Sequence, residues 1–183
     1  MNQDAMIYAG SLLAFGLAAI YAGLWLFWTD PRNVDKREKV PRQLVPGILF
    51  TVPCLIWCVP NARPIMPDSM QDWCWPLVII CSILAIAFLD YLFSRALGGF
   101  LILVSYYFLQ ESFTWHTSGA MVLAVFCYLA GTVGICFAGK PHLMRDLIRL
   151  CARSRRWKLS WSIFCWCFGA MTLLQGTLHL LNR

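Results

Sequence analysis

The sequence predicts an all-α polytopic membrane protein: a bundle of six transmembrane helices with both termini outside, plus one cytoplasmic interfacial amphipathic helix. Hydrophobic residues make up 60% of the 183 residues and charged residues only 13%, whereas about a quarter of an average soluble protein is charged. The charges gather in short blocks that separate apolar segments of membrane-spanning length. We therefore expect a single transmembrane domain over residues 1–183, with spans at about 6–28, 44–60, 76–93, 96–113, 119–138 and 160–181.

The basic stretch from Lys140 to Lys158 orients these spans, because it holds seven bases and the single acid Asp146. Short basic loops are translocated poorly and stay on the cytoplasmic side. The three segments that then lie inside hold 5, 1 and 7 of the 15 bases, and the outer segments hold only Arg63 and Arg183. This asymmetry predicts an inner or plasma membrane location. The N-terminal residues MNQDA carry no base, so the first apolar segment is expected to be a retained span and not a secretory signal.

The first span, 6–28, carries a small residue at every fourth position: Gly10, Ala14, Ala18 and Ala22. Such a stripe allows another helix to approach closely. The partner is either a second copy of the chain or another helix of the same chain. We expect the second arrangement, because a protein with many spans offers many internal partners.

The second span, 44–60, contains Pro46, Pro53 and Pro60 at intervals of seven residues. An interior proline leaves the carbonyl four residues earlier without its usual donor. In transporters such broken helices mark binding sites, which makes Pro53 a candidate binding residue. The alternative is an ordinary kink that fits a short span. We favour the kink, because no acidic, Asn or Gln side chain accompanies the break.

The third and fourth spans are separated only by Ser94 and Arg95, which predicts a tight hairpin turn on the cytoplasmic side. A less favoured arrangement makes 76–113 one long helix with a re-entrant piece. A charge at Asp90, near the end of the third span, is costly unless it is paired or lies near the interface. Arg95 lies five positions on, beyond the spacing that aligns side chains on one helix face, and Lys140 or Arg145 is at least as plausible a partner.

Two further groups of small residues predict close helix packing. Gly98 and Gly99 open the fourth span, and Ala130, Gly134 and Ala138 line one face of the fifth. Both patterns permit backbones to approach closely in a membrane, and the glycine pair could instead give flexibility.

Residues 142–156 form the predicted amphipathic helix. Its apolar side chains cluster on one face and its arginines on the other, the pattern of a helix that lies in the membrane interface. We expect its arginines to contact anionic lipid headgroups. A docking face for an acidic protein is the alternative. The four arginines are Arg145, Arg149, Arg153 and Arg156.

Four polar residues near the outer ends of the spans form the candidate small-molecule site: Glu111, His116, Gln175 and His179. A histidine titrates near neutral pH and a carboxylate can accept its proton, so these residue types suit a quinone headgroup or a proton relay. The simpler explanation is that residues at helix ends meet water. A bis-histidine haem is not expected, since His116 falls in a loop.

Motifs for other chemistry are missing from the sequence. There is no G-x-S-x-G, H-E-x-x-H, phosphate loop or C-x-x-C, the patterns of common hydrolases, nucleotide sites and dithiol centres. We predict no catalytic residue, no metal site, no cofactor and no nucleic-acid partner. Most of the nine cysteines fall in apolar segments, where they are expected to pack as small side chains.

The sequence therefore predicts a non-enzymatic integral membrane component, an accessory or assembly subunit that positions partners in the bilayer. Its expected partners are the lipid bilayer and either another membrane protein or a second copy. Two alternatives remain open: a small transporter or channel that uses the proline-broken second span, and a quinone-linked redox subunit that uses His116 and His179.

Overall fold

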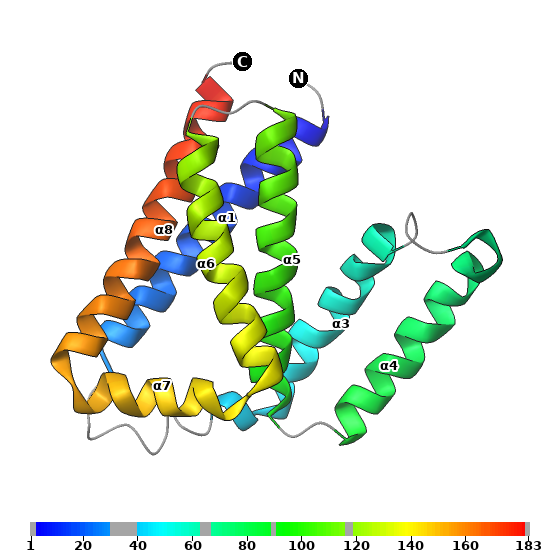
Figure 1. The fold of residues 1–183 in the computed structure, drawn as a ribbon, viewed down its shortest axis with the longest axis horizontal. Helices are drawn as coiled ribbons and strands as arrows, with labels where there is room; N and C mark the ends of the chain where they lie inside the picture. The colour runs from blue at the N-terminus through cyan, green and yellow to red at the C-terminus, as the bar shows by residue number, and fades with distance from the viewer. Residues whose placement is uncertain (1–2, 30–39, 63–66, 89–90, 116–118, 182–183) are drawn as a thin grey trace. The chain divides into compact units, whose positions relative to one another are not determined.

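The computed structural model describes residues 3–29, 40–62, 67–88, 91–115 and 119–181. No strand occurs among them, which confirms the all-α prediction, and six helices are long and apolar enough to cross a membrane. Figure 1 shows the elements in order. They are α1 (Gln3–Phe27), η2 (Val40–Arg42), α3 (Leu44–Ala62), η4 (Asp68–Trp73), α4 (Cys74–Phe88), α5 (Leu92–Thr114), α6 (Ala120–Gly139), α7 (His142–Arg153) and α8 (Arg155–Leu181).

Two predicted boundaries are wrong, and both errors involve charged residues. The amphipathic helix ends at Arg153 and α8 begins at Arg155, because the Lys158 N–H donates to the Ser154 carbonyl (3.1 Å) and starts a new helix. Ser94 and Arg95 do not form the hairpin turn, since α5 already begins at Leu92. Charge marks the edge of the apolar region, whereas backbone hydrogen bonds decide where a helix starts.

The chain divides into two compact units. The first consists of 1–35, 105–130 and 146–183, and the second of 36–104 and 131–145. Helices α5, α6 and α7 each contribute to both units. Each unit has its own packed interior and is described separately.

In the first unit α1 lies alongside α8, as Figure 1 shows. Glycines allow the contact: a Cβ added to Gly169 would lie 2.8 Å from the Gly16 carbonyl oxygen. Phe15 then packs edge-on against Phe108 and Phe168, with ring centroids 5.5 and 5.4 Å apart. At the far end of α1, Lys158 Nζ donates to the Thr29 carbonyl (2.9 Å), satisfying an acceptor that the helix leaves open.

Within the first unit, the described helices leave the small-residue stripe on α1 uncovered, contrary to the expectation. Gly10, Ala14, Ala18 and Ala22 are all exposed, and a Cβ added to Gly10 would meet nothing within 4 Å. At 100° per residue the stripe lies opposite the face that carries Gly16. Helix α1 thus has two small-residue faces, and α8 covers the one that the four-residue spacing did not mark.

The second unit contains α3, α4, the first half of α5 and the end of α6. Here the close packing predicted from glycine is confirmed, since a Cβ added to Gly98 would lie 2.6 Å from the Gly134 carbonyl oxygen. Phe50 of α3 packs edge-on against Phe93 and Phe100 of α5, at 5.7 and 5.6 Å.

Candidate functional site

A cluster of polar and aromatic side chains joins α1, α5 and α8 at one end of the first unit. Glu111 and Trp115 stand one helical turn apart, which brings their side chains to the same face. Trp115 Nε1 donates a 2.8 Å hydrogen bond to Glu111 Oε2. The backbone N–H of Trp115 also donates to the Glu111 carbonyl (2.9 Å), so the helical turn continues past the end of α5.

The His179 imidazole sits between two aromatic rings. Its centroid lies 5.8 Å from that of Trp115, at an interplanar angle of 66°, and 5.4 Å from that of Tyr8, at 88°. Edge-to-face geometry of this kind is favourable for aromatic rings. His179 is 9% exposed and Tyr8 is fully buried, so the imidazole is held inside the protein and not at its surface.

Gln175 lies one turn before His179 on α8 and is completely buried. The backbone of Gly119 approaches it, since a Cβ added there would lie 3.3 Å from Gln175 Nε2. Gly119 also has a φ of 82°, a conformation that favours glycine. The backbone at Gly119, just before α6, therefore lies close to the buried side-chain amide of Gln175.

The structure links Glu111 to His179 through Trp115 and places Gln175 on the same helix as His179. His116, the fourth predicted member, lies outside the described residues. Sequence reasoning missed Tyr8 and Trp115. The four-residue spacing from Glu111 is a signal for Trp115, whereas Tyr8 comes from a distant span with no local pattern to reveal it.

These groups combine aromatic walls with an imidazole, an amide and a carboxylate. An imidazole exchanges protons near neutral pH, and a flat polar headgroup fits between aromatic rings. The cluster is therefore suited to holding a planar polar group or to moving a proton.

The remaining predicted binding residue, Pro53, belongs to the second unit. It is exposed and lies inside α3, which continues from Leu44 to Ala62. Two residues before Pro53, Thr51 Oγ1 donates to the Gly47 carbonyl at 2.7 Å. Hydroxyl back-bonding of this kind often accompanies a bend in a helix.

The arginines of the predicted lipid face differ in their surroundings. Arg149, Arg153 and Arg156 are exposed. Arg145 is half-buried and its Nη1 reaches the Tyr91 hydroxyl at a long 3.5 Å. Ile148, about one turn after Arg145 on α7, is 2% exposed, so the protein covers this apolar side chain itself.

Within the described residues, no group of three His, Cys, Asp or Glu side chains is placed to hold a metal ion. No protein-family model matches the chain, and neither the curated proteins nor the solved structures include a significant match.

Proposed function

We propose that this protein is a non-enzymatic integral membrane component, an accessory or assembly subunit that holds a membrane partner through α1. The exposed stripe of Gly10, Ala14, Ala18 and Ala22 carries the proposal. Apolar side chains alone give little drive for association in lipid, so helices associate where small residues let their backbones approach. Four such residues in register, which the described helices of the first unit leave open, favour a helix from another molecule.

The packing of α1 against α8 supports this assignment. The face of α1 that carries Gly16 is already occupied, because an added Cβ would lie 2.8 Å from Thr172 Oγ1. The stripe therefore remains available while the first unit stays intact. The partner is another membrane protein or a second copy of the chain.

Co-purification tests the proposal. The full-length tagged chain is extracted in mild detergent, and its partners are quantified by mass spectrometry against the double variant A14I/A18I. Bulky side chains in a close-packed seam cost about 1–3 kcal/mol each, so recovery of a stoichiometric partner should fall about tenfold or more. Ala170→Ile, at an exposed position of α8, is the matched control and should leave recovery unchanged.

Equal recovery with the double variant and with the control would contradict the proposal, as would a chain that purifies alone. When the partner is a second copy, two differently tagged chains purify together, and the double variant separates them.

The proposal places the protein in a plasma or inner membrane, with both termini outside and α7 in the cytoplasmic interface. In this orientation the exposed arginines on α7 and at the start of α8 face anionic headgroups. Each arginine contributes about 1 kcal/mol to membrane binding. Support comes from the exposure of Arg149, Arg153 and Arg156 in the same basic block. Epitope tags at the two termini should react with antibody in intact cells, and a tag reached only after permeabilisation would contradict this orientation.

A second candidate function, a quinone-linked redox subunit, is favoured by the buried contact of His179 with Tyr8 and Trp115. An organic extract of the purified chain should then contain quinone, and His179→Ala should remove it. His142→Ala, at an exposed position, should not. A wild-type extract without quinone would exclude this role for the isolated chain.

A further inference from the structure

A cavity of about 600 Å³ lies between α3, α4 and α5 in the second unit. Its volume is in the range of pockets that hold small molecules. Helix α3 contributes Thr51 and Cys54, α4 contributes Leu84 and Ala85, and α5 contributes Leu92 and Arg95. None of these residues belongs to the cluster around His179.

The walls of the cavity are apolar except at one point. Arg95 is the only charged residue among the described residues that line it. The Thr51 hydroxyl is already engaged with the Gly47 carbonyl. The Arg95 side chain is half-buried, and its Nε is fully buried with no hydrogen-bond acceptor among the described residues. Because the half-buried Arg95 side chain borders apolar walls, its positive charge favours an anionic partner.

The position of Arg95 along α5 separates the polar and apolar parts of the cavity. It lies three residues after Leu92, the first residue of the helix, or about 4.5 Å along the axis. Gly99, which also lines the cavity, lies about 6 Å deeper. If α5 crosses the membrane from Leu92, as proposed, the charge stands at the level of the lipid headgroups and the apolar walls extend toward the hydrocarbon region.

One side of the cavity is formed by a helix that the protein covers little. Leu84 on α4 is 49% exposed although it lines the cavity. A ligand can thus enter sideways from the bilayer, and this route suits a lipid better than a soluble anion.

We propose that this cavity binds one acidic phospholipid, whose phosphate contacts Arg95 and whose acyl chain lies along the apolar walls between α3, α4 and α5. The net negative charge of such a lipid complements Arg95, the only charged residue among the described residues of the lining, and its acyl chain matches the apolar walls. This site does not depend on the partner proposed for α1, which would bind the first unit.

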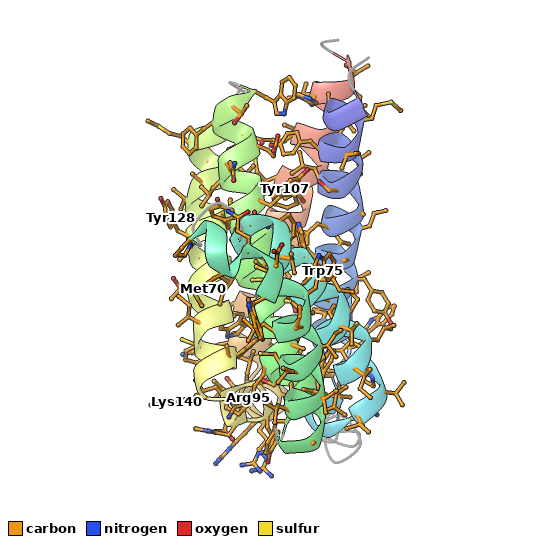
Figure 2. The ribbon with its side chains drawn as sticks, turned by 90° about the vertical axis from the view of Figure 1, so that its right-hand side faces the viewer. Met70, Trp75, Arg95, Tyr107, Tyr128 and Lys140 are labelled. Carbon is orange, nitrogen blue, oxygen red and sulfur yellow. The ribbon has the colours of Figure 1, made fainter. Side chains whose placement is uncertain are left out.

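Native mass spectrometry of the full-length chain tests the site. The protein is purified in mild detergent with equal amounts of phosphatidylglycerol and phosphatidylcholine. The wild type should retain one phosphatidylglycerol. Arg95→Gln should lower the occupancy of this lipid about tenfold, because a charge-assisted contact is lost. Arg95→Lys should keep most of the occupancy. Lys140→Gln is the matched control: Lys140 is an exposed base near the same end of this unit (Figure 2), and it does not line the cavity.

A second variant tests the apolar part without removing the charge. Ala85→Trp fills the cavity from α4 and should also displace the lipid, while far-ultraviolet circular dichroism and gel-filtration volume stay as in the wild type. Equal phosphatidylglycerol occupancy in Arg95→Gln and wild type would overturn the proposal. So would equal retention of phosphatidylcholine, displacement of the lipid by inorganic phosphate alone, or a free fatty acid as the retained species.

Discussion

The contact between α1 and α8 gives a quantitative prediction, because it depends on the absence of a side chain at Gly169. A Cβ added there would lie 2.8 Å from the Gly16 carbonyl oxygen and 3.2 Å from the Ile20 nitrogen. Ordinary contacts of a Cβ begin at 3.4 Å, so α1 would have to retreat by about 0.6 Å in the Gly169→Ala variant. Overpacking of this kind costs about 1–3 kcal/mol.

Gly10→Ala supplies the matched control. It is also a mid-helix glycine, but an added Cβ meets nothing within 4 Å. Both substitutions gain up to about 1 kcal/mol from the higher helix propensity of alanine. The difference between the two variants therefore isolates the steric cost.

The free energy of unfolding can be measured by titrating dodecylmaltoside micelles with SDS and following helix content by circular dichroism. Gly10→Ala should be as stable as the wild type or slightly more stable. Gly169→Ala should be less stable than Gly10→Ala by about 1–3 kcal/mol. Equal stability of the two variants would refute the close packing of α1 on α8 through Gly169.

Two further predictions concern the end of the first unit at which α8 begins. Lys158→Met removes the donor to the Thr29 carbonyl, so the same titration should show a loss of about 1–2 kcal/mol, whereas Arg156→Met, at an exposed position, should show almost none. Burial raises the pKa of the Cys151 thiol above its usual value, and the nearby charge of Lys158 offsets only part of this shift. The thiolate is the reactive form, so iodoacetamide at pH 8 should label Cys151 more slowly in the folded chain than after unfolding in SDS. The labelling rate should still be rising with pH above about 8.5, the ordinary pKa of a thiol. Equal rates in the two states, read from the labelled peptide by mass spectrometry, would rule out this shift.

The sequence determined the class of the protein, because apolar length and charge blocks are local properties. The structure contains six helices that are long and apolar enough to span a membrane, as the six apolar segments predict. The approach of α5 and α6 was also predictable, since Gly98 and Gly134 both lack a side chain at the point of contact. The sequence of α7 also indicated one apolar and one basic face, and in the structure Ile148 is buried whereas Arg149 is exposed.

Only the tertiary structure decided which faces are covered. A stripe of small residues shows that a helix can be approached closely, but not by which helix, so the sequence could not tell that α8 takes the Gly16 face of α1 and leaves Gly10 exposed. The contact of Tyr8 with His179 joins residues from opposite ends of the chain. The cavity beside Arg95 likewise needs three helices to form its walls. Such features arise from packing between distant segments, for which a single sequence carries no periodic signal.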